Sequence, residues 1–284
     1  MTDEERTIRA RETANGILAV LRALKEYQYP YLYWYLYKLE KGELFGYAEK
    51  LFSFVLERKH FLMYRNQFRF FVSANHNSRR VREKGPGSNK TSFHLIKLLS
   101  ALGVIWNVSQ NDAKAMDINK IFKQDRAIHD GTDTVYMNIY AFHKLTPQRL
   151  RVIEKRAERL AEAEVTKTNI SFCYLGMNGC RDLADELYPN NDPKAIEKKE
   201  LEYSQMIQIL NKLIDQKGFA TKKEIQTRMK IKTSELQNLL NDVKPRMKKI
   251  YRYGRPTNEH KARFGIPKKR NGYIYTRIEE ENKD

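Results

Sequence analysis

The chain has 284 residues, with 53 Lys and Arg against 35 Asp and Glu and a formal net charge of +18. A hydrophobic fraction of 41 % with 17 Tyr and 13 Phe excludes an intrinsically disordered chain, and no apolar run approaches the roughly 18 residues that a membrane span needs. The length predicts about two domains, and a positive field of this size attracts nucleic acid or an anionic membrane surface.

The positive charge is concentrated in two blocks. Residues 222–277 hold 17 basic and 4 acidic side chains, and residues 58–97 hold 10 basic side chains and one acidic side chain. The rest of the chain is slightly acidic. Two basic blocks on a nearly neutral frame predict two contact surfaces for an anionic partner, although a solvated basic face is the other interpretation of either block.

Residue types at the start of the chain and the cysteine content predict a cytoplasmic protein. Residues 1–16 are charged and lack the apolar core of a signal peptide. Cys173 and Cys180 are expected to be reduced thiols, and they lack the spacing of a zinc site. The aspartates between 112 and 133 also lack a ligand spacing. We therefore expect no metal and no cofactor.

Residues 1–43 are expected to form an N-terminal helical segment. Apolar residues recur at helical spacing over 3–26. The Tyr-rich stretch that follows, 27–42, contains Pro30, which breaks or begins an element. This stretch fits either an aromatic core with hydroxyls at the surface or a platform on which bases stack. No basic side chain is interleaved before Lys38, which favours the aromatic core.

Residues 44–145 are predicted to fold as one module. A basic, turn-forming segment around 85–87 precedes an amphipathic helix that ends at Gly103. The pattern then changes to a strand at 104–108, and after a long loop a second strand returns at 134–142. The predicted order is a helix followed by a β-hairpin.

Residues 146–190 are predicted to be connecting helices. Thr146 caps a helix with Pro147 at its first position, and a second helical stretch covers about 168–187. The segment 188–193, YPNNDP, is rich in turn-forming residues and is the predicted domain boundary.

Residues 191–284 are predicted to form the last domain. A helix over 195–217 is closed by Gly218, and a second helix begins at Thr221, which forms a capping-box pattern with Glu224.

A third helix and a basic hairpin complete this domain. The turn is expected at 230–232. Thr233 or Ser234 is expected to cap the helix, which runs to about residue 247, with Pro245 ending or kinking it. Strands are expected at 250–253 and 272–278, with a cationic loop between them.

This order of elements, with this charge, resembles the winged-helix superfamily of DNA-binding domains. The resemblance implies a mainly α fold with small β-hairpin wings, in which tandem winged-helix domains at 44–145 and 191–284 are joined by helices. Two such modules in one chain also resemble the replication initiators of plasmids and phages and some dimeric transcription regulators.

The resemblance implies that one helix of each module enters the major groove of DNA and that each hairpin contacts the backbone. In the first module the expected contacts are Arg79, Arg80, Arg82, Lys84, Asn89, Lys90, Thr91 and His94. On the third helix of the last domain they are Lys232, Thr233, Ser234, Gln237, Asn238, Asn241 and Lys244. In the last wing they are Arg252, Arg255, Lys261, Arg263, Lys268, Lys269 and Arg270.

Three of these residues carry an argument about base readout. Gln237, Asn241 and Lys244 are separated by four and three residues, which places them on one face of a continuous helix. Gln and Asn side chains pair bidentately with adenine.

We therefore expect a non-enzymatic protein that binds specific double-stranded DNA sites, as a transcription regulator or an origin-binding initiator of a bacterium or mobile element. The connecting helices would space the modules or carry a homodimer interface, and no membrane partner is expected. Two alternatives stay open. His260 and Arg263 form an HxxR pattern upstream of Tyr273 and Tyr275, which is similar to tyrosine recombinases but has a shorter interval. Winged helices also serve as protein-interaction modules.

Overall fold

The computed structural model describes two compact units, 1–170 and 171–284. The described residues are 2–58, 61–64, 67–71, 89–108, 139–189, 191–267 and 272–278. The division at Ile170 comes before the boundary expected at 188–193, because the helices between these positions pack within the second unit. The segment expected to connect two domains is therefore shared between them.

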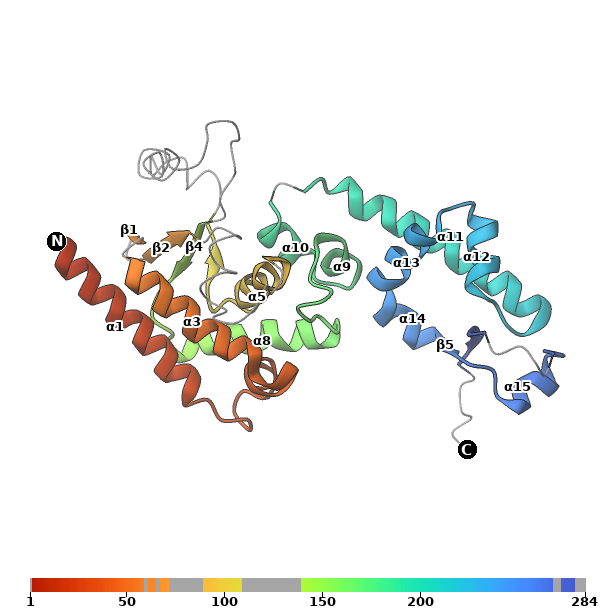
Figure 1. The fold of residues 1–284 in the computed structure, drawn as a ribbon, viewed down its shortest axis with the longest axis horizontal. Helices are drawn as coiled ribbons and strands as arrows, with labels where there is room; N and C mark the ends of the chain where they lie inside the picture. The colour runs from red at the N-terminus through yellow and green to blue at the C-terminus, as the bar shows by residue number, and fades with distance from the viewer. Residues whose placement is uncertain are drawn as a thin grey trace. The chain divides into compact units, whose positions relative to one another are not determined.

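The first unit is mainly helical and contains one small sheet (Figure 1). Its elements are α1 (Asp3–Arg22), α2 (Pro30–Tyr33), η1 (Trp34–Lys38), η2 (Leu39–Gly42), α3 (Glu43–Arg58), β1 (Phe61–Tyr64), β2 (Gln67–Phe71), α5 (Asn89–Leu102), β3 (Trp106–Asn107), β4 (Ile139–Phe142) and α8 (Pro147–Glu162). α1 and α3 lie side by side, and the Arg22 guanidinium reaches the Glu49 carboxylate at 3.1 Å.

The sheet is antiparallel, with the order β1-β2-β4-β3. The hairpin of β1 and β2 was not predicted. The expected hairpin of β3 and β4 is present, but β4 also pairs with β2 and is thus an inner strand. Phe142 of β4 meets the ring of Phe52 edge-on, at 5.3 Å between centroids. The two strands of this hairpin belong to the core sheet, and the rest of the expected wing lies outside the described residues.

The Tyr-rich segment divides between core and surface. Pro30 begins α2, as predicted, and the Glu154 carboxylate accepts hydrogen bonds from the backbone N–H groups of Tyr31 and Leu32, each at 2.9 Å. Tyr35 is buried and donates its hydroxyl to the carbonyl of Val165 at 2.9 Å. Tyr35 is therefore aromatic core, Tyr29, Tyr33 and Tyr37 are half-buried, and Tyr27, Tyr31 and Trp34 are exposed.

Helix α5, the candidate recognition helix of the first module, is enclosed over its second half. Every residue from Leu95 to Leu102 is buried, and the helix packs against α3, α8 and β3. Even Lys97 and Ser100 are only 2 % and 0 % exposed. This half of α5 is a core helix without an outward face, because the sheet and two helices surround it.

Removing the buried charge at Lys97 is expected to stabilise the protein. Burial lowers the pKa of Lys97 to about 8 from its ordinary 10.5. Between these two values the unfolded chain binds a proton that the folded chain does not, so stability is lost as the pH falls from 10.5 to 8. At about 1.4 kcal/mol per pKa unit, Lys97→Met should raise the free energy of unfolding at pH 7 by roughly 1–3 kcal/mol.

Urea unfolding of both proteins at several pH values tests this expectation. The gain from Lys97→Met should shrink as the pH rises from 8 to 10.5, because the folded protein then holds Lys97 neutral while the unfolded chain still binds the proton. A gain that is equal at pH 7 and pH 10.5 would mean that better packing, and not removal of the charge, is responsible.

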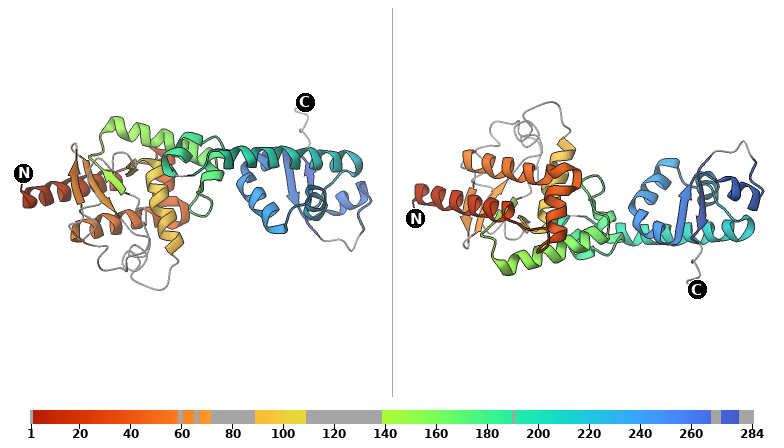
Figure 2. Two further views of the ribbon diagram at one scale, coloured as in Figure 1. Left: turned by 90° about the horizontal axis from the view of Figure 1, so that it is seen from above. Right: turned by 90° about the horizontal axis from the view of Figure 1, so that it is seen from below.

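The second unit contains the three helices and the strand pair predicted for 191–284, with two further short helices, α14 and α15, among them and two before them (Figure 2). Its elements are α9 (Phe172–Met177), α10 (Arg181–Leu187), α11 (Lys194–Lys217), α12 (Lys222–Met229), α13 (Thr233–Asp242), α14 (Lys244–Ile250), β5 (Tyr251–Gly254), α15 (Asn258–Arg263) and β6 (Ile274–Arg277). β5 and β6 pair antiparallel, and Ala220 bridges to Tyr275 on the other side of β6.

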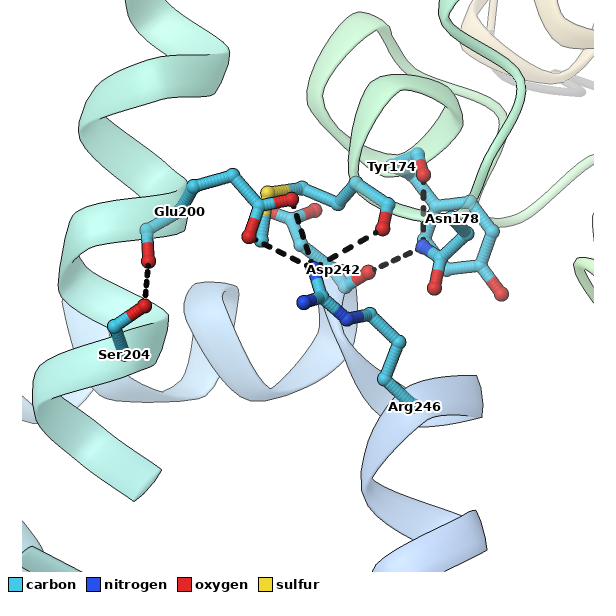
Figure 3. Close-up of polar contacts among 7 residues, drawn as sticks. Tyr174, Asn178, Glu200, Ser204, Asp242 and Arg246 are labelled. Carbon is cyan, nitrogen blue, oxygen red and sulfur yellow. Dashed lines mark hydrogen bonds and ion pairs between the residues drawn. The ribbon is translucent and has the colours of Figure 1, made fainter. Parts of the chain in front are cut away.

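Two polar side chains, Arg246 and Asn178, tie the end of α9 to α11, α13 and α14 (Figure 3). The Arg246 guanidinium of α14 contacts both carboxylate oxygens of Glu200, at 2.8 and 2.9 Å, and donates to the carbonyl of Met177. The side-chain amide of Asn178 donates to the carbonyl of Asp242, the last residue of α13, at 2.7 Å. The segment expected to be a connector thus supports the carboxyl end of α13.

Candidate nucleic-acid interface

The start of α12 is fixed by the predicted capping box. The Thr221 hydroxyl oxygen accepts the backbone N–H of Glu224, whose carboxylate in turn accepts the backbone N–H of Thr221 at 3.0 Å. Lys217 forms an ion pair with the same carboxylate. These contacts hold the pKa of Glu224 below its usual value despite its partial burial. The first residue of α12, Lys222, is thereby placed beside the hairpin and α13.

The turn between α12 and α13 falls where it was predicted. Lys230 ends α12 in the left-handed conformation, with φ 56°. Lys232 is the N-cap of α13, and its backbone N–H donates to the Glu235 carboxylate at 2.9 Å. The prediction of Thr233 or Ser234 as the cap was wrong by one or two residues, since Thr233 is already the first helical residue.

Helix α13 has one buried face and one exposed face. Leu236, Leu239 and Leu240 are buried. All seven predicted contact residues of this region are exposed, namely Lys232, Thr233, Ser234, Gln237, Asn238, Asn241 and Lys244. The helix is thus anchored by leucines and presents amides and hydroxyls to solvent.

The helix is shorter than predicted. α13 ends at Asp242, Val243 leaves the helical conformation with ψ 9°, and α14 begins at Lys244 with Pro245 in its first turn. Pro245 has no N–H to bond the preceding turn, so the helix is interrupted there. The spacing argument therefore holds for Gln237 and Asn241 but does not extend to Lys244.

The hairpin carries a stack of three tyrosines on one face. The Tyr253 ring lies between Tyr275, at 4.5 Å between centroids, and Tyr273, at 5.2 Å. Tyr253 and Tyr273 remain 42 % and 49 % exposed. The Lys222 ammonium is 5.0 Å from the centroid of Tyr253, and the Arg255 guanidinium is 5.7 Å from that of Tyr273.

Lys222 joins this stack to α13. Its Nζ donates to Oε1 of Gln237 at 3.0 Å, and Nε2 of Gln237 donates to Oδ1 of Asn241 at 2.8 Å. Six neighbouring side chains thus form one surface, which we call the candidate interface. It consists of half-buried Lys222 and the exposed residues Gln237, Asn241, Tyr253, Arg255 and Tyr273. The sequence prediction missed Lys222 and both tyrosines, although the alternating tyrosines of YRYG and GYIY were a signal for one hairpin face.

Other predicted wing residues are distributed differently. Arg252 is exposed, but strand alternation directs it to the hairpin face opposite Tyr253. Lys261 and Arg263 belong to α15, a helix inside what was predicted to be a loop, and Thr257 caps it by accepting the His260 N–H at 3.1 Å. Lys268, Lys269 and Arg270 lie outside the described residues.

The first module contributes little to a described interface. Arg79, Arg80, Arg82 and Lys84 lie outside the described residues, and for Asn89, Lys90 and Thr91 only the helical backbone is described. His94 is half-buried, with its ring 6.1 Å from that of Phe93.

The residues of the recombinase-like pattern lie in different surroundings. Tyr275 is 5 % exposed within the stack, and burial raises the pKa of its hydroxyl, which disfavours the phenolate. His260 lies on α15, where its ring stacks on Phe264 at 6.1 Å between centroids.

Within the described ranges no three His, Cys, Asp or Glu side chains gather as metal ligands would. The described helices also include none with the length and apolar character needed to cross a bilayer.

Comparisons with known proteins give no relative: no protein-family model, curated protein or solved structure matches the chain.

Proposed function

We propose that this protein binds specific sites on double-stranded DNA through its second unit. The observation that carries the proposal is the exposed amide face of α13 beside Lys222 and the tyrosine stack. Exposed amides on a rigid helix supply the donors and acceptors that base edges require. Cations on the adjacent hairpin and helix start supply the phosphate contacts that hold a protein in register.

The contacts that hold α13 in place also favour the proposal. Its leucines are buried, and its carboxyl end is held by Asn178 at 2.7 Å. A helix that enters a groove must keep its orientation when the protein binds, because a small displacement separates a side chain from the base edge that it contacts. The second unit provides that rigidity around the polar face.

The biological role that we propose is that of a transcription regulator or an origin-binding replication initiator of a bacterium or mobile genetic element. The two roles differ in where the sites lie. Sequencing of genomic fragments retained by the protein would separate them, since sites at single promoters favour the regulator and iterated sites in one region favour the initiator.

Selection from randomised duplexes tests the binding proposal. We expect a defined consensus, and Asn241→Ala should change the preferred base at one position of it by about 5- to 150-fold, the discrimination of one bidentate contact. The matched control is Gln208→Ala, which removes an exposed amide from α11 and should leave the consensus unchanged. Failure of the unmodified protein to bind any duplex at 0.1 M salt would reject the proposed function.

A further inference from the structure

The exposed amides of the candidate interface are held by a third group. Lys222 donates to Gln237 at 3.0 Å, and Gln237 donates to Asn241 at 2.8 Å. The Lys222 ammonium also lies 5.0 Å from the centre of the Tyr253 ring, an attractive cation–π distance. Lys222 belongs to α12, so the orientation of two side chains on α13 is set from another element.

We infer that Lys222 is a positioning residue for base readout: it orients the Gln237 amide so that Asn241 becomes the residue that recognises adenine. This inference rests on the proposed function and deepens it, because it names the base class read at one position and the residue that sets it.

The orientation follows from the chemistry of the three groups. An ammonium carries only donors, so the oxygen of the Gln237 amide must face it; turning the amide over would place NH₂ against NH₃⁺. The Gln237 NH₂ group then faces Asn241, four residues later on the same helix face. Asn241 can meet that donor only with its oxygen, so its own NH₂ group is directed away from Gln237.

The two amides consequently differ in what they can offer a base. Bidentate recognition of adenine needs an oxygen that accepts from N6 and an N–H that donates to N7. Asn241 keeps both N–H donors and the second lone pair of Oδ1. Gln237 uses both ends of its amide within the protein, its oxygen toward Lys222 and one of its two N–H groups toward Asn241. Asn241 is therefore the amide prepared for adenine, and Gln237 acts as its support.

The test compares Lys222→Met with Lys223→Met. Both lysines lie in the first turn of α12, and each change removes one positive charge. Lys222 belongs to the candidate interface, whereas the side chain of its neighbour Lys223 is exposed and does not. We expect the unmodified protein to prefer adenine at the position whose preference Asn241→Ala abolishes. Lys222→Met should reduce that preference at least fivefold, Lys222→Arg should retain most of it, and Lys223→Met should lower affinity without changing preference.

A readout without DNA accompanies the selection. The side-chain NH₂ resonances of Gln237 and Asn241 in the free protein should shift in Lys222→Met and stay in place in Lys223→Met. Unmoved resonances, or an adenine preference that Lys222→Met retains, would overturn this inference while the proposed function stands. Loss of duplex binding by every protein, including the unmodified one, would instead reject the proposed function, and the resonances alone would then decide the orientation.

Discussion

Replacing Gly218 by alanine is expected to destabilise the second unit by about 2–4 kcal/mol, from backbone strain of roughly 1 kcal/mol or more and a forced repacking of similar or larger cost. Gly218 ends α11 in the left-handed conformation with φ 80°, which favours glycine. A Cβ atom there would lie 2.0 Å from Cδ1 of Phe264. Phe264 packs on the small core of Phe219, Ile266 and Ile274 beneath the hairpin, so the ring cannot move without opening that core.

Substitutions at two other glycines separate the cost of backbone strain from the cost of the clash with Phe264. Gly265 also has a positive φ, 61°, but a Cβ there meets nothing within 4 Å, so Gly265→Ala should cost only the backbone strain. Gly272 has neither feature, and Gly272→Ala should be nearly neutral. Urea unfolding followed by circular dichroism gives the three values. Equal losses for Gly218→Ala and Gly265→Ala would show that Phe264 does not occupy the space next to Gly218.

Replacing Lys268, Lys269 and Arg270 together by alanine is expected to weaken duplex binding by roughly several hundredfold at 0.1 M salt. Each phosphate contact changes the slope of log K against log salt by about 0.9, so the loss of three contacts should flatten the slope by nearly three. These cations were predicted from the sequence as wing residues, between the buried anchors Ile266 and Ile274. Because phosphates carry no sequence information, the loss should be the same for all duplexes.

The matched control is the triple replacement of Lys194, Lys198 and Lys212 by alanine. These three lysines are exposed on α11 and lie outside the candidate interface, and their removal changes the net charge equally. Titrations by fluorescence anisotropy at several salt concentrations compare the two triples. Similar losses in both would point to a general charge effect, and an unaffected wing triple would remove the wing from the binding surface.

Some cations of the basic block make contacts within the second unit. Arg246 is engaged with Glu200 and Met177, and its guanidinium lies 4.1 Å from the Tyr203 ring. Arg277 pairs with Asp215 on α11 at 2.9 Å. Part of the positive charge of this region is therefore paired within the unit, which no count along the sequence could have shown.

Local signals were sufficient for much of the second unit. Thr221 with Glu224 marked the start of α12, Gly218 marked the end of α11, and Pro245 marked the interruption before α14, each within one or two residues. These signals act over three or four residues through hydrogen bonding and backbone conformation, so they are legible without knowing what the helix packs against.

The first unit was predicted less well because its outcome depends on packing between distant segments. The pattern around α5 fitted a helix with one apolar face, but α3, α8 and β3 enclose its second half, including Lys97. The pairing of β2 with β4 joins residues about seventy positions apart. Such pairing is favoured by contacts that form only in the folded chain, and no periodicity within one segment reports it.

Short-range caps, breakers and hydrophobic spacing were enough to predict α11, α12, the start of α13 with its polar face, and the strand pair, but not α15 between the strands. The tertiary structure alone decided which side chains meet. It brought Lys222 onto Gln237 from another helix, stacked Tyr253 between two tyrosines and directed Arg246 inward. Side-chain orientation is set by neighbours that are remote along the chain, and the arrangement of the candidate interface became visible only when those neighbours were in place.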